Sequence, residues 1–283
     1  VFIGFLLLLN ISNFNYSSNL PLYYVFFVLP IICLIWEPVV FFFPFIASVL
    51  IIRLNNNQIM TILSKIIIAF IPALTVFMII ITNPLTAEEH LIMANSLKEN
   101  FGEVCYMACA LLKSKASIAA QFKGNISAYS LEIFIRYFLI VLIGFGPIFL
   151  LCFNTKLKIQ ILFFQYFNNL LSPVLIILLP VLIMFSAMAD WGRVVNISYT
   201  FTVLFYFYLF QNKLLEVNFE KIAKKISFIK DKKYLLVLCF IIYAFGWNPK
   251  TTLVGDVASI PGYRVPYKLL KHIDDRYGIP YKF

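Results

Sequence analysis

Long runs of apolar residues alternate with short polar segments along most of this chain of 283 residues. A helix needs about 20 apolar residues to cross the hydrocarbon core of a bilayer. Runs that reach or approach that length cover 21–52, 59–82, 131–153, 161–189 and 194–211. The pattern therefore predicts an all-α fold, a polytopic bundle of transmembrane helices.

Two shorter runs flank these segments, VFIGFLLLL at residues 1–9 and YLLVLCFIIYAFGW at 234–247. The first is about half as long as a span, and we interpret it as a truncated first helix. A signal peptide is the alternative, although no basic segment precedes the run. Together the runs predict about six to eight spans in a single integral membrane domain covering 1–283.

The tract 21–52 is interrupted by three prolines and by Glu37, which follows Trp36. Two short helices hinged at Glu37-Pro38 fit this pattern, and so does one span followed by a re-entrant segment. Glu37 then marks either an interfacial turn, with Trp36 in the aromatic belt, or the floor of a cavity, because irregular backbone at membrane depth must be buried in protein.

The composition agrees with a membrane protein, since 62% of the residues are hydrophobic and only 13% are charged. Soluble domains average about 45–50% apolar and about 25% charged residues. The net charge of +10 does not indicate a nucleic-acid partner here, because cytoplasmic loops of membrane proteins collect lysine and arginine. We expect membrane lipid, and no nucleic acid, as a partner.

The basic residues also predict an orientation. Seven lysines lie in 211–233, which the positive-inside rule assigns to the cytoplasm. Counting the spans backwards then assigns three polar pieces to the extracytoplasmic face. They are the loop 83–130, residues 190–193 (hereafter the DWGR corner) and the C-terminal tail 248–283.

The loop 83–130 is predicted to be folded and helical. Thr86 and Glu89 have the spacing of a capping box, which opens a helix running to about Lys98. A second helix is predicted from an apolar spacing of i, i+4, i+7, i+8 at Val104, Ala108, Leu111 and Leu112. The tail 248–283 is rich in turns around one short basic helix at 265–277.

The sequence contains no nucleotide-binding GxxxxGK[ST] loop, no HExxH and no GxSxG elbow. ATP-driven transport and the familiar metalloprotease and serine-hydrolase chemistries are therefore not indicated. Cys105 and Cys109 are four residues apart in the loop, but the second pair of a zinc site is missing. We predict no metal and no cofactor.

Two acid–base pairs are predicted at the outer ends of neighbouring spans. Asp190 and Arg193 are three residues apart, while Glu132 and Arg136 are four apart, so each pair shares one helix face. Charges at membrane depth are costly and by default suggest function. The pairs fit a polar cluster that binds an anionic group through arginine, a salt-bridge network that locks helices together, or an interfacial turn.

The DWGR corner after a folded external loop, with Glu132 and Arg136, resembles polytopic proteins of bacterial surface-polysaccharide clusters. These are similar to O-antigen or capsule polymerases and, more distantly, to polyprenyl-phosphate-dependent membrane glycosyltransferases. The latter usually carry an acid just after the first helix, and NISNFNYSSNLP at 10–21 has none. The polymerases are therefore the better fit.

This resemblance implies glycosyl transfer or polymerisation of an undecaprenyl-linked glycan at the outer face of a bacterial inner membrane. Arg193 and Arg136 then bind the pyrophosphate, and Asp190 or Glu132 acts as the general base. Candidate substrate-binding residues are Trp191, Glu88, His90 and Arg264. The alternatives are a transporter or flippase of lipid-linked precursors, and a non-catalytic subunit that binds envelope-assembly proteins.

Overall fold

The computed structural model describes residues 1–13, 19–54, 58–83, 85–105, 109, 118–127, 129–159, 162–188, 190–220, 222 and 232–246. Helices dominate these residues, and the strands among them form a single two-stranded antiparallel sheet. The described part of the chain fits the predicted all-α class. The predicted helix at 265–277 and most of the predicted helix after Val104 lie outside the described residues.

The N-terminal part contains a helical hairpin and a long peripheral helix. Its elements are α1 (Phe2–Ile11), α2 (Leu20–Ile35), the 3-10 helix η1 (Glu37–Phe42), α3 (Phe43–Leu54) and α4 (Ile59–Thr82). Of the two interpretations of 21–52, the helices hinged at Glu37-Pro38 are observed. Glu37 begins η1 and lies half-buried at this turn. The predicted span 59–82 coincides with α4.

The rest of the chain adds the loop helices and the central bundle. In order these are α5 (Ala87–Phe101), α7 (Ile118–Ser127), α8 (Leu131–Phe153), β1 (Thr155–Leu157), the 3-10 helix η2 (Leu162–Tyr166), α9 (Leu171–Leu178), α10 (Val181–Ala187), α11 (Trp191–Gln211), β2 (Leu215–Val217) and α14 (Lys233–Gly246). Residues 131–153 form one helix as predicted. α11 starts three residues before the predicted 194.

The predicted span 161–189 is not one continuous helix. The described residues there form η2, then a non-helical segment with a β-bridge between Asn169 and Lys156, and then the two short helices α9 and α10. Pro180 separates these helices, because proline donates no backbone hydrogen bond and its ring clashes with the preceding turn. Because the whole run is apolar, its hydropathy does not indicate this break.

Within the part of the chain that the structure describes, four helical segments are long and apolar enough to cross a membrane: Glu37–Leu54, Ile59–Thr82, Ile133–Phe153 and Trp191–Gln211. Large apolar side chains cover the outside of α4, where Met60 is 80% exposed and Ile67 is 59% exposed. Such a surface is unfavourable in water and suits contact with lipid. A multi-pass membrane protein fits these findings, while the predicted number of spans stays a prediction.

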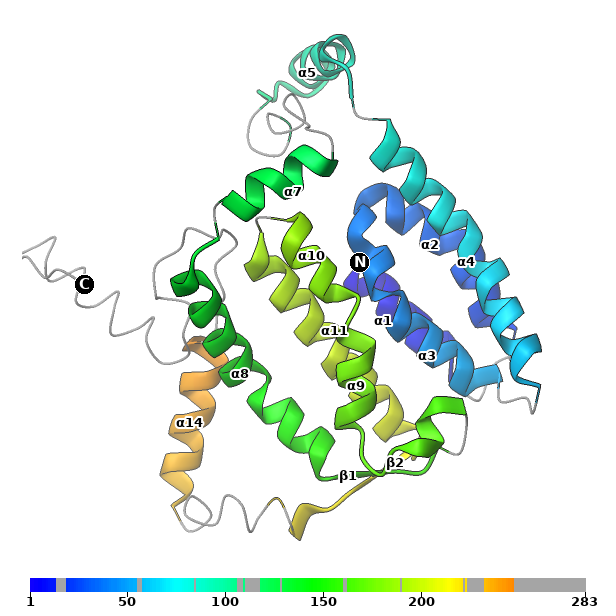
Figure 1. The fold of residues 1–283 in the computed structure, drawn as a ribbon, viewed down its shortest axis with the longest axis vertical. Coiled ribbons are helices and arrows are strands. Elements are labelled where there is room, and N and C mark those ends of the chain that lie inside the picture. Colours follow the sequence, from blue (N-terminus) through cyan, green and yellow to red (C-terminus); the bar gives the residue numbers. More distant parts are fainter. Residues whose placement is uncertain are drawn as a thin grey trace, which may run out of the picture.

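α11 is the centre of the bundle (Figure 1). Of its candidate span, 56% is buried, similar to the 61% of Glu37–Leu54 and far more than the 17% of α4. Aromatic rings from several helices pack around Phe201, with Phe5 stacked on it at 4.2 Å between ring centroids and Phe42 at 4.7 Å. α14 packs against α8, where the Tyr243 hydroxyl donates a hydrogen bond to the Gly144 carbonyl oxygen.

α8 and α11 run parallel, so both helices begin at one end of the bundle and end at the other. Trp191, at the start of α11, contacts Tyr137 near the start of α8. β1 directly follows α8 and pairs with β2, which follows α11, in the register Lys156 opposite Glu216. Figure 1 shows α5 and α7 at the end of the bundle where α8 and α11 begin, which we call the Asp190 end. The strands β1 and β2 lie at the opposite end of the bundle, which we call the sheet end.

Candidate functional site

Asp190 and Arg193 form an ion pair at the first turn of α11. The Arg193 Nε donates to Asp190 Oδ2 at 2.9 Å, and the Arg193 backbone N–H donates to Oδ1 at 3.3 Å. Asp190 is thus the N-cap of α11 as well as the partner of the guanidinium. This is why the acid and the base stand at this corner: the acid satisfies an otherwise unpaired backbone donor, and the base neutralises the acid.

The two side chains differ in their exposure. The Asp190 side chain is 22% exposed, whereas that of Arg193 is 54% exposed. Burial raises the pKa of the Asp190 carboxyl above its usual range, and the positive charge of Arg193 together with its backbone N–H opposes this rise. The site therefore combines an exposed cation at a helix N-terminus, where anions are favoured, with a carboxylate suited to accept a proton.

Aromatic rings hold this corner in place. The Trp191 indole N–H donates to the Phe185 carbonyl oxygen at 2.6 Å, and the Tyr129 hydroxyl donates to the same oxygen at 2.6 Å. The rings of Phe134 and Tyr137, on α8, lie 5.5 and 5.1 Å from the Trp191 ring. Trp191 was predicted to bind substrate, and with only 3% exposure little of its ring is accessible at the surface.

The second predicted pair, Glu132 and Arg136, lies on the first two turns of α8. α8 begins at the N-cap Ser130, whose hydroxyl accepts a hydrogen bond from the Ile133 backbone N–H. Because Phe134 and Tyr137 contact Trp191, this part of α8 lies beside the DWGR corner. The helix segments that carry both pairs are therefore adjacent, while the side chains of Glu132 and Arg136 lie outside the described residues.

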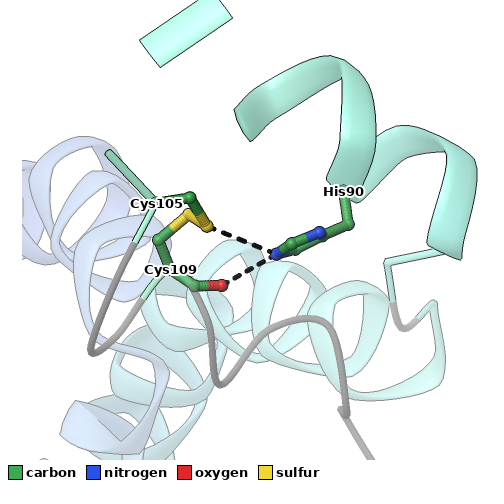
Figure 2. The surroundings of a disulfide bond; sticks show 3 residues. All are labelled: His90, Cys105 and Cys109. Atoms are coloured by element: carbon green, nitrogen blue, oxygen red, sulfur yellow. Dashed lines mark hydrogen bonds between the residues drawn. A yellow bond between two sulfur atoms is a disulfide. The ribbon is translucent and has the colours of Figure 1, made fainter. Parts of the chain in front are cut away.

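Glu88 and His90 lie in the first turns of α5, at the same end of the bundle but in a different environment. The predicted capping box is confirmed: Glu89 N–H donates to the Thr86 hydroxyl, and the Glu89 carboxylate accepts from the Thr86 backbone N–H at 2.8 Å. His90 contacts Cys105 and Cys109 rather than the corner (Figure 2). Arg264 lies outside the described residues.

A polar cavity of about 480 Å³ lies at the sheet end. Most of its polar lining groups are side-chain amides, joined by one lysine: Asn154, Lys156, Gln165, Asn168, Asn169 and Asn218. Sequence reasoning missed this cavity, because residues 154–160 only separate the apolar runs 131–153 and 161–189 in the hydropathy pattern. The sequence signal was the pair Asn168-Asn169 inside a run assigned to a helix.

Comparison with known protein families, with curated proteins and with solved structures found no match to this chain.

Proposed function

We propose that this protein transfers or polymerises a glycan carried by a polyprenyl pyrophosphate, at the extracytoplasmic face of a bacterial inner membrane. The ion pair of Asp190 and Arg193 at the start of α11 carries the proposal. It combines an exposed guanidinium, a helix N-terminus and a half-buried carboxyl in one place. Phosphate groups are among the ligands that both arginine and helix N-termini bind.

In the proposed reaction, the hydroxyl oxygen of the acceptor sugar forms a bond to the anomeric carbon of the donor sugar. The bond between that carbon and the pyrophosphate oxygen breaks, and polyprenyl pyrophosphate leaves. Asp190 accepts the proton of the attacking hydroxyl. Arg193 shifts from Asp190 toward the pyrophosphate and stabilises the negative charge that develops there. Arg136 is the second candidate for that contact, because its helix segment lies beside the corner.

Two observations favour the extracytoplasmic side for the Asp190 end. The lysine-rich segment 211–233 begins at the opposite end of α11, and the positive-inside rule assigns it to the cytoplasm. Cys105 and Cys109, which follow α5 at the Asp190 end, form a disulfide. Disulfides persist in oxidising compartments and are rare in the cytoplasm.

The test uses Arg193→Ala, Arg193→Lys and Asp190→Asn in cells that make the surface glycan. Lys98→Ala, on exposed α5, is the matched control for loss of a positive charge at the same end. We expect Arg193→Ala and Asp190→Asn to shorten the glycan to single repeats, Arg193→Lys to retain part of the length, and Lys98→Ala to have no effect. Normal glycan from Arg193→Ala at normal protein abundance would rule the proposal out.

A binding measurement separates this enzyme from the transporter and from the non-catalytic subunit. Purified protein in detergent is titrated with undecaprenyl pyrophosphate, and its product formation from a lipid-linked repeat is followed in parallel. The proposed enzyme converts the repeat, whereas a flippase only moves it across proteoliposome membranes, and a subunit does neither alone.

A further inference from the structure

His90, Cys105 and Cys109 form a cluster that the proposed glycosyl transfer does not use. The sulfur atoms of Cys105 and Cys109 are joined in a disulfide. The Nε2 of His90 lies 3.6 Å from Cys105 Sγ and 3.0 Å from the Cys109 carbonyl oxygen. Figure 2 shows the imidazole of α5 directed at the disulfide. The ring is nearly buried, at 8% exposure.

The sequence builds this cluster through the two ends of α5. The capping box at Thr86 begins the helix and places His90 in its first turn. Gly102 ends the helix in the left-handed region, at a φ of 66° that glycine adopts without strain. The backbone N–H of Glu103 donates to the Leu97 carbonyl oxygen, so the chain turns away from the helix and Cys105 follows within reach of His90.

The disulfide itself is expected to stabilise the fold only weakly. It joins residues four apart, and a cross-link stabilises a fold less when the loop that it closes is shorter. A bridge this local therefore contributes less stability than one that closes a long loop. The same three side chains offer one imidazole nitrogen and two sulfurs whose positions lie within 4.8 Å of one another.

We propose that reduction of this disulfide converts the cluster into a binding site for a thiophilic cation, Zn²⁺ or Cu⁺. Thiolate and imidazole are the ligands that these ions prefer, and two cysteines four apart have a spacing found in zinc sites. In tetrahedral coordination the donor atoms lie roughly 3.5–3.8 Å apart. The sulfurs need only separate after reduction, with small rotations of the side chains, to reach that geometry.

The chemistry balances with a dithiol as the reductant. The dithiol supplies two electrons and two protons, its own sulfurs become a disulfide, and the Cys105–Cys109 bond breaks to give two thiols. The cation then displaces one proton from each thiol. In the oxidised cluster the Nε2–H of His90 donates to the Cys109 carbonyl oxygen. When the cation binds, this proton leaves Nε2 while Nδ1 takes one up from water, and the freed lone pair of Nε2 bonds to the metal in place of the hydrogen bond.

The experiment uses the full-length protein in detergent, freed of metal with a chelator. Oxidised protein and protein reduced with a phosphine are titrated with Zn²⁺ against a chromophoric competitor. Co²⁺ is the spectroscopic probe, because thiolate ligation gives a charge-transfer band. The variants are His90→Ala and the double variant Cys105→Ser/Cys109→Ser, and Cys152→Ala, a free buried cysteine of α8, is the matched control.

We expect about one equivalent of Zn²⁺ to bind the reduced protein and the reduced Cys152→Ala control. We also expect at least about tenfold weaker binding by His90→Ala, and no thiolate band from the double variant or from oxidised protein. Equal Zn²⁺ binding by the oxidised and the reduced wild-type protein would overturn the proposal, and this comparison needs no variant. A thiolate band retained by the double variant would overturn it as well. These outcomes are independent of the glycan assay.

Discussion

Tyr129 and Trp191 donate hydrogen bonds to one and the same acceptor, the carbonyl oxygen of Phe185. Their rings lie 5.2 Å apart. Tyr129 precedes α8, Phe185 belongs to α10, and Trp191 is the first residue of α11. Hydrogen bonds to this shared acceptor therefore connect the three chain segments that surround the Asp190–Arg193 ion pair.

The shared acceptor predicts non-additive losses of stability. Tyr129→Phe or Trp191→Phe alone leaves the Phe185 oxygen with one donor, so we expect each hydrogen-bond loss to cost about 0.5–1.5 kcal/mol. The double variant leaves that oxygen without either donor, and its cost should exceed the sum by about 0.5–3 kcal/mol. Unfolding in detergent measures this, with Tyr234→Phe on the exposed face of α14 as the control. Simple additivity would contradict the arrangement.

Arg193 should set the protonation of Asp190. Burial raises the pKa of Asp190, and the charge of Arg193 opposes that rise. Arg193→Ala should therefore raise the pKa further. Because a raised pKa disfavours the ionised form in the folded state, the variant should lose stability as the pH rises through the new pKa.

Infrared spectroscopy can follow the protonated carboxyl of Asp190, identified as the band that Asp190→Asn removes. The band should persist to higher pH in Arg193→Ala than in wild type, and Lys98→Ala should leave it unchanged. A band with the same pH dependence in Arg193→Ala and wild type would show that the guanidinium does not stabilise the carboxylate.

The capping box of α5 gives a prediction with a defined pH dependence. Hydrogen bonds from the Thr86 backbone and hydroxyl lower the pKa of Glu89. They therefore stabilise the first turn at neutral pH, and this contribution is lost as the pH falls through the lowered pKa, below the usual value of about 4.3. Thr86→Ala should weaken the turn by about 1 kcal/mol and reduce this pH response without abolishing it, because the backbone N–H of residue 86 still donates to the Glu89 carboxylate.

Amide hydrogen exchange at residues 87–91, corrected for the intrinsic rate at each pH, measures the effect. We expect about fivefold faster exchange in Thr86→Ala, with Glu88→Gln, which changes the neighbouring acid, as the control. Unchanged exchange in Thr86→Ala would show that the box does not hold the helix start.

Sequence reasoning found the features that depend on local chemistry. The apolar period located α4 and α8, and the spacing of Thr86 and Glu89 located the start of α5. The pairing of Asp190 with Arg193 followed from their separation of three residues. Each of these depends on residues within one or two helical turns.

The features that depend on tertiary contacts were not found. Uniform hydropathy hid the break at Pro180, because α9 and α10 are both apolar. The pairing of β1 with β2 joins segments about sixty residues apart in sequence and follows from the parallel packing of α8 and α11. His90 was expected to bind substrate, yet it contacts a disulfide fifteen residues away, which no local pattern indicates.

The central claim is that the Asp190–Arg193 pair faces the outside of the cell, and cysteine labelling tests it most directly. An impermeant maleimide is applied to intact cells that carry Asn95→Cys on α5, Arg193→Cys on α11 or Glu216→Cys on β2, each in a background without Cys105 and Cys109. We predict labelling at 95 and 193 in intact cells, and at 216 only after permeabilisation. Labelling at 216 in intact cells, with 95 and 193 protected, would contradict the account.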